Sequence, residues 1–214
     1  MMIPVLAVTT THHRIHHLIK DVHYGLIEHF VIFCYYCLIN NMIYFLVYLL
    51  FVRGQYMHEI NVLVEIPKNS MVKYEIDKET GMLTVDRFIY TAMGYPFNYG
   101  YLPNTISKDG DPVDVMVIST HPVQAGSILP SRVIGMLEME DEAGIDNKII
   151  AIPTKKVDPF YASVQTLSDL NEATQKLIKH FFEQYKDIEP GKWTKVRNFL
   201  DKEAAWREIE ESKI

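Results

Sequence analysis

Hydrophobic and polar residues alternate along several short segments that begin near residue 61. Residues 62–66 and 72–76 both carry apolar side chains at every second position, and Lys73 and Glu75 form the polar face of the second segment. This period of two is typical of strands with one buried face. Residues 77–81 (Asp-Lys-Glu-Thr-Gly) then predict a turn between two paired strands. The predicted strands span residues 62–66, 72–76, 83–88, 113–118, 132–138 and 148–152.

A helical pattern replaces the alternation near the C-terminus. Between residues 170 and 185, apolar side chains recur at three- and four-residue spacing, which predicts an amphipathic helix. Ser168 or Asp169 is expected to cap its start, because a side-chain oxygen there can accept from a first-turn N–H group. Residues 202–211 predict a shorter second helix. Strands followed by helices predict an α+β or mainly β fold with a closed or strongly curled sheet.

The composition limits the class of function. The chain has 214 residues, 48% of them hydrophobic, which is enough for one domain with a packed core. Its 27 acidic and 21 basic residues give a net charge of −6, which argues against a general nucleic-acid binder. A small phosphate ligand stays compatible with this charge if metal ions supply the positive charge. Both cysteines, Cys34 and Cys37, precede the alternating region, which suits a reducing, cytoplasmic location.

The first 56 residues differ from the rest of the chain. Residues 30–52 form an uncharged run of 23 residues, and a helix of that length reaches across a bilayer core of about 30 Å. Three interpretations stay open: a membrane anchor, a signal sequence (although no small-residue cleavage site follows), or an extension that precedes a true start at Met57. We expect an uncertain extension over residues 1–56 and the working domain over residues 57–214.

Three carboxylates stand close together in the segment Asp109-Gly110-Asp111-Pro112-Val113-Asp114. They repel one another unless cations lie between them, and oxygen ligands of this kind suit Mg²⁺, Ca²⁺ or Mn²⁺ rather than zinc. The glycine permits a tight turn and the proline stiffens it. An acidic surface turn is the competing interpretation, and it would be preferred if this motif stood alone.

A second acidic stretch makes a metal site more credible. Residues 138–146 contain five carboxylates, and Lys148 follows them. A solvated hairpin tip is the alternative, since Ala143-Gly144 has the composition of one. Two acidic turns that each follow a strand could face one cavity and hold several divalent ions. Four cations, Lys73, Arg87, Lys148 and Lys186, and two tyrosines, Tyr99 and Tyr185, could bind an anion there, although each alone is more often a surface charge or a core aromatic.

From about residue 61 to residue 193 the sequence closely resembles the family I soluble inorganic pyrophosphatases of the bacterial type. The resemblance is carried by VEIP (64–67), KYEIDKETG (73–81), VDRF (85–88), YPFNYGYLPNT (95–105), DGDPVDV (109–115), DEAGIDNK (141–148) and HFFEQYKDIEPGKW (180–193). It implies a small OB-like five-stranded closed barrel flanked by two or more helices. Bacterial members of this family usually form homohexamers, so the resemblance also implies an oligomer.

The resemblance assigns a role to each matched position. Asp109, Asp114 and Asp146 correspond to ligands of tightly held Mg²⁺, and Asp141 to a ligand of further metal. Asp111 corresponds to the general base for the attacking water. The residues that match pyrophosphate-binding groups are Lys73, Arg87, Tyr99, Lys148, Tyr185 and Lys186. Glu65 and Glu75 match carboxylates that contact the water ligands of the metal or support its ligands.

The expected reaction is Mg²⁺-dependent hydrolysis of inorganic pyrophosphate to two orthophosphates, with several Mg²⁺ ions per site and Mn²⁺ as a substitute. Two neighbouring metal ions lower the pKa of a shared water, so no covalent intermediate is required. Two rival functions stay open: a non-catalytic OB-like module that binds nucleotides or nucleic acid, and a membrane-tethered phosphatase of another diphosphate. The first rival predicts a basic groove with exposed aromatic residues.

Overall fold

The computed structural model describes residues 59–214. The predictions made for the apolar run at 30–52, for both cysteines and for a boundary at residue 57 therefore lie outside the described residues. Within residues 59–214, no helix is long and apolar enough to cross a membrane.

Strands make up most of the regular structure in this region. Two short 3-10 helices, η1 (Pro159–Tyr161) and η2 (Leu167–Asp169), precede the helix α4 (Glu172–Gln184), and α5 (Lys202–Glu211) is the last element. The strands are β1 (Glu59–Ile66), β2 (Val72–Ile76), β3 (Leu83–Phe88), β4 (Asn98–Tyr101), β5 (Asp114–Val117), β6 (Ile128–Asp141), β7 (Gly144–Ile145), β8 (Lys148–Pro153) and β9 (Thr194–Leu200).

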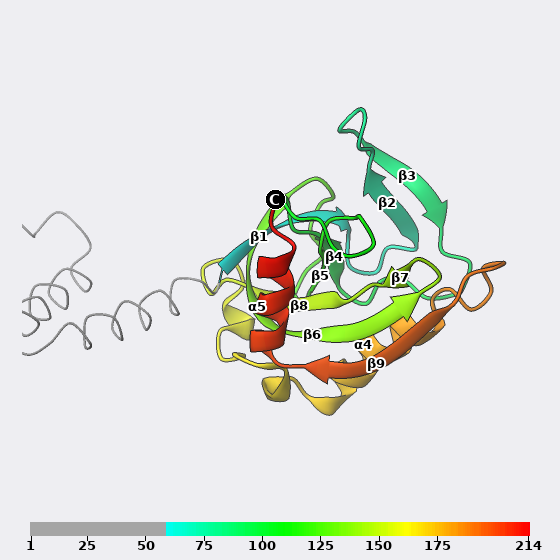
Figure 1. The fold of residues 1–214 in the computed structure, drawn as a ribbon. Coiled ribbons are helices and arrows are strands. Elements are labelled where there is room, and N and C mark those ends of the chain that lie inside the picture. The colour runs from blue at the N-terminus through cyan, green and yellow to red at the C-terminus, as the bar shows by residue number, and fades with distance from the viewer. Residues whose placement is uncertain (1–58) are drawn as a thin grey trace, which may run out of the picture. The chain divides into compact units, whose positions relative to one another are not determined.

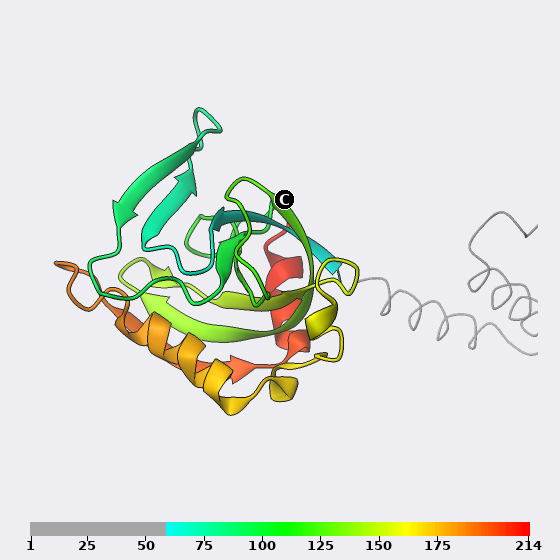
Figure 2. The same cartoon turned by 180° about the vertical axis from the view of Figure 1, so that it is seen from behind.

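Five of these strands close into a ring. The order β1-β4-β5-β8-β6 returns to its start because β6 also pairs with β1. Only the β5–β8 pair in this ring is parallel. β7 and β9 each pair with β6 in antiparallel orientation outside the ring. β2 and β3 form a separate hairpin that stands away from the ring (Figure 1). The helix α5 packs on β6, and the reverse view shows α4 along β9 (Figure 2). The predicted fold class is confirmed.

Gly100 allows β1 and β4 to approach each other closely. A Cβ at this position would lie 1.9 Å from the carbonyl oxygen of Leu63, far inside van der Waals contact. The β1–β4 register also shifts between Val64 and Ile66, which bends β1 where the ring curves. A glycine is therefore required at this point of the ring for steric reasons.

The alternation along the strands sorts side chains into two cores. Val115 and Val117 on β5 pack in one cluster with Ile149 and Ala151 on β8, and this cluster includes residues of α5. The intervening positions, Met116, Ile118, Ile150 and Ile152, pack in the other cluster with residues of α4. Because neighbouring side chains of a strand point to opposite faces, the apolar runs that follow Asp114 in β5 and Lys148 in β8 supply both cores.

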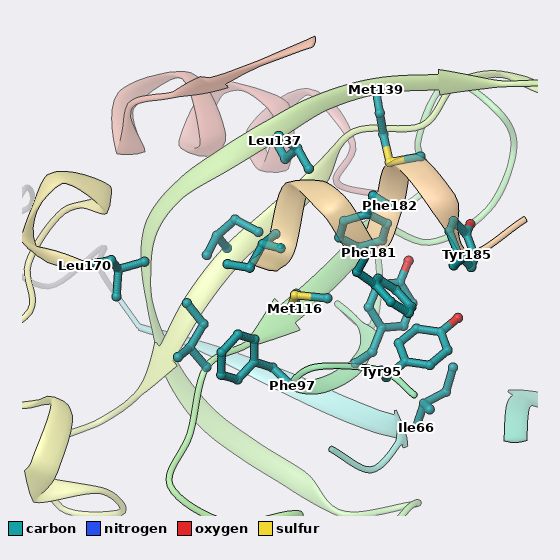
Figure 3. Packing of buried hydrophobic residues seen from close by; sticks show 14 of the residues in the cluster. Ile66, Tyr95, Phe97, Met116, Leu137, Met139, Leu170, Phe181, Phe182 and Tyr185 are labelled. Atoms are coloured by element: carbon teal, nitrogen blue, oxygen red, sulfur yellow. The ribbon is translucent and has the colours of Figure 1, made fainter. Parts of the chain in front are cut away.

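The core beneath α4 is rich in aromatic side chains. Phe181, Phe182 and Tyr185 project from α4 toward Met116 and Tyr95 (Figure 3). The ring centroids of Phe181 and Tyr185 lie 5.0 Å apart, and those of Tyr95 and Phe181 lie 4.8 Å apart. This packing fixes the end of α4 that carries Tyr185.

The predicted helices are present, but the predicted cap of the first is wrong. Asn171 caps α4, since its Oδ1 accepts a hydrogen bond of 2.8 Å from the Thr174 N–H. Asp169 instead accepts from the Thr166 N–H and closes η2. The sequence offers three candidate caps within four positions, and a separate 3-10 turn uses the earlier ones. The helix expected at 202–211 is confirmed, with Asp201 as its cap.

Candidate active site

The first aspartate turn is a tight loop between β4 and β5. Asp109 Oδ1 accepts a hydrogen bond of 3.0 Å from the Asp111 N–H, and the Ser107 N–H donates to the Asp111 carbonyl over 2.7 Å. Gly110 has φ +88°, which a glycine adopts without strain. The turn ends at Asp114, the first residue of β5.

Lys148 lies between two of the predicted metal ligands. The parallel β5–β8 register pairs Val115 with Ile149, which places Asp114 beside Lys148 at the start of both strands. Lys148 Nζ forms ion pairs with Asp114 and Asp146, and its side chain is only 3% exposed. The two acidic turns therefore meet at one buried ammonium group.

Negative charge exceeds positive charge around this ammonium. Burial raises the pKa of Asp146 to about 6, and the charges of Asp114 and Asp141 add to the effect of burial against Lys148. Burial also raises the pKa of Asp109, helped by Asp111 and Asp114. Although burial alone favours the neutral amine, Asp114 and Asp146 together raise the pKa of Lys148. The pKa values of the acids rise mainly because these groups are buried, and the pKa of the base rises because it lies between two carboxylates.

A second buried ion pair joins the 141–146 turn to the end of α4. Lys186 Nζ lies 2.7 Å from Asp141 Oδ2, and both side chains are less than 10% exposed. Lys186 also approaches Glu142 at 3.5 Å, and Lys192 pairs with the same carboxylate. Although partial burial would raise the pKa of Glu142, these lysines lower it to about 2. The turn is held by cations that follow α4 in sequence.

Two predicted anion-binding tyrosines line the same region. Tyr99 lies beneath the ammonium group of Lys148, which is 5.9 Å from the ring centroid. Burial raises the pKa of Tyr99 and of Tyr185 well above the usual range, and Asp114 and Asp146 add to both shifts. Both phenols therefore keep their protons and can donate hydrogen bonds.

The β2–β3 hairpin contributes a second set of paired charges. Lys73 and Arg87 face each other across the hairpin, and both form ion pairs with Asp86. Lys73 also pairs with Glu75. The Nε atom of Arg87 lies 3.0 Å from Glu189 Oε2, which connects the hairpin to the segment after α4. The charge of Arg87 also acts on the pKa of Tyr185, which places it near the aspartate cluster.

Glu65 is a buried carboxylate at the end of β1. Its Oε1 accepts a hydrogen bond of 2.8 Å from the Ile76 N–H, which fixes the hairpin to the ring. Burial raises the pKa of Glu65 to about 7, and the charges of Asp114 and Glu75 contribute. Glu65 therefore lies within electrostatic reach of the aspartate cluster.

The structure brings most of the predicted residues together and leaves two at the solvent-exposed edge. Glu75 is half exposed beside Lys73, and Asp111 is 65% exposed and pairs with Lys78 at 2.5 Å. The remaining predicted residues surround the buried ammonium or interact electrostatically with its neighbours: Glu65, Lys73, Arg87, Tyr99, Asp109, Asp114, Asp141, Asp146, Lys148, Tyr185 and Lys186.

Sequence reasoning missed a residue that orients a cation and an aromatic residue that packs against a predicted tyrosine. Glu189, with a side chain 5% exposed, orients Arg87, and Tyr95 packs between Tyr99 and Phe181. Both lie within segments that carry the family resemblance. Their local pattern gave no chemical signal, because their partners are distant in the chain.

The donor chemistry of the cluster fits a hard divalent cation. Its ligand candidates are carboxylate oxygens without sulfur or imidazole. The pKa values of Asp109 and Asp146 are raised mainly by burial, and neighbouring carboxylates add to both shifts. Among residues 59–214, no three acidic, histidine or cysteine side chains are gathered as a preformed metal cage. The ammonium group of Lys148 stands between two of the candidate ligands, Asp114 and Asp146, and pairs with both.

A closed ring of strands with buried carboxylates, ordered lysines and protonated tyrosines has the side-chain chemistry expected of a hydrolase that acts on phosphate groups with the help of metal ions. The model of the inorganic pyrophosphatase family matches residues 62–213, and the chain belongs to that family of metal-dependent hydrolases. Among curated relatives, the inorganic pyrophosphatase of Aquifex pyrophilus is 56% identical over 151 residues, or 71% of this chain and 85% of the relative. That of Rickettsia prowazekii is 56% identical over 155 residues, with 72% and 90% covered.

Solved structures agree with the sequence relatives. An inorganic pyrophosphatase from Coxiella burnetii matches with a TM-score of 0.71 and 50% identity, over 73% of this chain and 94% of that one. The enzyme from Helicobacter pylori matches with the same score and identity, over 72% and 91%. The structure from Thermus thermophilus gives a TM-score of 0.70 at 38% identity, over 73% and 90%.

Proposed function

We propose that this chain hydrolyses inorganic pyrophosphate to two orthophosphates in a Mg²⁺-dependent reaction. The observation that supports this most strongly is the buried Lys148, which lies between Asp114 and Asp146 in a cluster with excess negative charge. Pyrophosphate is a compact polyanion, so a site that binds it needs both cations of the protein and bound metal charge. In this proposal, the lysines and Arg87 supply the cations of the protein, and the aspartates supply oxygen ligands for the metal.

Asp109, Asp114 and Asp146 are the proposed ligands of the tightly held Mg²⁺, and Asp141 is a ligand of further metal. Oxygen ligands suit Mg²⁺ and Mn²⁺, and we propose Mg²⁺ as the native ion with Mn²⁺ as a substitute. When bound, Mg²⁺ neutralises charge on the diphosphate and lowers the pKa of a water molecule. Glu65 and Glu75 are the proposed carboxylates that contact the water ligands of the metal or support its ligands.

The cations and tyrosines bind the two phosphoryl groups. Lys73, Arg87 and Lys186 are each held by a carboxylate, so their positive charges are oriented before an anion arrives. The guanidinium group of Arg87 can donate two parallel hydrogen bonds to one phosphate. Lys148, Tyr99 and Tyr185 donate further hydrogen bonds, because the phenols keep their protons at neutral pH.

Asp111 is the proposed general base. It is exposed, and its backbone is fixed by the hydrogen bond to Asp109. A carboxylate at this edge can accept the proton of the attacking water, while Asp109 and Asp114, two and three residues away, bind metal. Asp111 forms an ion pair with the exposed Lys78 and raises the pKa of that ammonium group.

Phosphate release in the presence of Mg²⁺ tests the proposal. Pyrophosphate, nucleoside triphosphates, an isoprenoid diphosphate and a phosphomonoester are compared at equal concentration, and we expect strong preference for pyrophosphate. A preference for the isoprenoid diphosphate would favour the membrane-tethered phosphatase. Absence of hydrolysis together with nucleotide or polynucleotide binding would favour the non-catalytic module.

We further propose a cytoplasmic homohexamer whose working domain spans residues 57–214. The family resemblance supports the hexamer, and the match of residues 62–213 to the family model supports the boundary. Sedimentation of the full chain tests the assembly, intact mass of the native protein tests the start at Met57, and fractionation of cells tests the compartment.

A further inference from the structure

The C-terminal segment is joined to the first aspartate turn by backbone hydrogen bonds. The Ile106 N–H donates to the Ser212 carbonyl over 2.7 Å, and the Ile214 N–H donates to the Asn104 carbonyl over 3.3 Å. Thr105 and Lys213 form an antiparallel bridge between these contacts. The tail that follows α5 therefore runs beside the chain that leads into Asp109.

Glu208 on α5 contacts both aspartate turns through the neighbours of the proposed ligands. Its Oε2 accepts a hydrogen bond of 3.3 Å from Asn147 Nδ2, and it lies 3.9 Å from the Nζ atom of Lys108. Asn147 stands between Asp146 and Lys148, and Lys108 precedes Asp109. One carboxylate with a side chain 9% exposed thus links two turns that are about forty residues apart in sequence.

Asn147 transmits this contact to the backbone of the second turn. Its Oδ1 accepts from the Met139 N–H at 3.3 Å, and the Asp146 N–H donates to the Met139 carbonyl at 2.9 Å. The Asn147 amide is therefore held on one side by β6 and on the other by Glu208. Loss of the Glu208 oxygen would leave a donor of this amide without its protein acceptor.

The aspartate turns need a fixed spacing because their carboxylates repel one another. Asp114 and Asp146 both form ion pairs with Lys148, and Asp109 stands in the same turn as Asp114. Each turn is a loop, and loops relax away from like charge unless other contacts hold them. A support that spans both turns keeps their oxygens at the spacing that a cation requires.

We propose that Glu208 is a positioning residue that holds the two aspartate turns at the separation required for tight Mg²⁺ binding. This inference rests on the proposed function, because it assumes that the turns bind Mg²⁺. Glu208 acts through Asn147 and, more weakly, through Lys108, which is 56% exposed and 3.9 Å away. It binds neither substrate nor metal.

The variant Glu208→Ala of the full chain tests the inference, with Glu211→Ala as the matched control. Glu211 lies on the same helix and is exposed, so its loss changes the helix charge equally without touching either turn. Mg²⁺ is titrated by calorimetry in the absence of pyrophosphate, and the Mg²⁺ dependence of hydrolysis is measured in parallel. We expect about tenfold weaker Mg²⁺ binding for Glu208→Ala and no change for Glu211→Ala.

A purely structural role for Glu208 predicts a different result. It would lower the melting temperature of Glu208→Ala and leave the half-saturating Mg²⁺ concentration of the folded protein unchanged, which would overturn the inference. Glu208→Gln keeps an oxygen that can accept from Asn147, so we expect its Mg²⁺ affinity to stay within about threefold of wild type. A tenfold loss in the glutamine variant would overturn the proposed route through Asn147.

Asn147→Ala provides a second test if Glu208→Ala does not fold. It removes the same hydrogen bond while Glu208 keeps its contact with Lys108, and we expect a comparable loss of Mg²⁺ affinity. Unchanged affinity in Asn147→Ala would refute the inference. Failure of the proposed function is separate, since wild-type protein would then bind Mg²⁺ without releasing phosphate from pyrophosphate.

Discussion

Replacement of Lys148 by methionine tests the charge balance on which the proposed site depends. The substitution keeps the length of the side chain and removes the ammonium group that pairs with Asp114 and Asp146. Two carboxylates then lie together without their common cation. We expect the folded protein to lose stability when metal is absent and to recover much of it when Mg²⁺ is added.

The magnitude follows from the burial of the three groups. Loss of one member of a fully buried ion pair destabilises a protein by about 3–5 kcal/mol. Here the lysine is 3% exposed, but Asp114 is 29% and Asp146 is 13% exposed, so water compensates part of the loss. Burial already raises the pKa of Asp146 to about 6, so this group can also take up a proton. We therefore expect about 2–4 kcal/mol, or a decrease in melting temperature of about 5–12 °C for a domain of this size.

Thermal unfolding of the full chain measures this effect in EDTA and in excess Mg²⁺. Mg²⁺ stabilises the folded state of both proteins, so the difference between variant and wild type shrinks only if the variant binds the ion more tightly. We expect tighter binding because the ammonium group no longer competes for the carboxylates, and a tenfold gain in affinity would offset about 1.4 kcal/mol, or roughly half of the difference. Lys156→Met removes an exposed lysine and serves as the control, with no difference expected in either condition.

Two results would refute the reasoning. An unchanged melting temperature of Lys148→Met in EDTA would mean that the carboxylates do not depend on this ammonium. A decrease of equal size in EDTA and in Mg²⁺ would mean that added metal does not compensate the lost charge, and the proposed ligands would have to be sought elsewhere.

Three further predictions concern other parts of the site and the ring. The pKa of Glu65 is about 7 in the folded protein, compared with its ordinary value of 4.5. Between pH 4.5 and pH 7 the folded state therefore binds a proton that the unfolded state has released, so the wild type loses stability as the pH rises through this range. Urea unfolding in EDTA measures this effect: between pH 5 and pH 8 the free energy of unfolding should fall by about 2–3 kcal/mol less for Glu65→Gln than for wild type. Parallel pH profiles of the two proteins would contradict this. Gly100→Ala should lower the free energy of unfolding by more than about 3 kcal/mol, because its Cβ would lie 1.9 Å from the Leu63 carbonyl oxygen. The control Gly126→Ala lies in open space with φ +86° and should lower it by only about 1–2 kcal/mol. Equal unfolding midpoints for the two variants would refute the steric argument. Asp111→Asn should bind Mg²⁺ normally and lose about a hundredfold or more in turnover at saturating Mg²⁺, whereas unchanged phosphate release would exclude Asp111 as the base.

The local pattern of the sequence determined several elements correctly. Alternation predicted the strand at 72–76, the turn after it predicted the returning strand at 83–88, and helical spacing between residues 170 and 185 predicted α4. These features are local, because a period of two or of 3.6 is complete within a short window. The concentration of aspartates at 109–114 likewise identified a candidate site without any knowledge of its surroundings.

Three strands escaped the same analysis: the two-residue β7, and the longer β4 and β9. β4 (Asn98–Tyr101) contains a glycine and side chains buried for contacts in the ring, and β9 (Thr194–Leu200) has no regular alternation. Both are strands because of their partners: β4 pairs with β1 and β5, and β9 pairs with β6. Pairing of this kind depends on residues far away in the chain, so intrinsic preference carries little information about it.

The chemistry of the site divides in the same way. The sequence determined which residue types are available, namely the aspartates, lysines and tyrosines of the resembling segments. Tertiary structure alone decided that Lys148 lies between Asp114 and Asp146, that Glu189 orients Arg87 from 102 positions away, and that Glu208 reaches Asn147 from 61 positions away. Charges interact through space, and only the closure of the ring and the register of its strands bring these distant side chains within reach of one another.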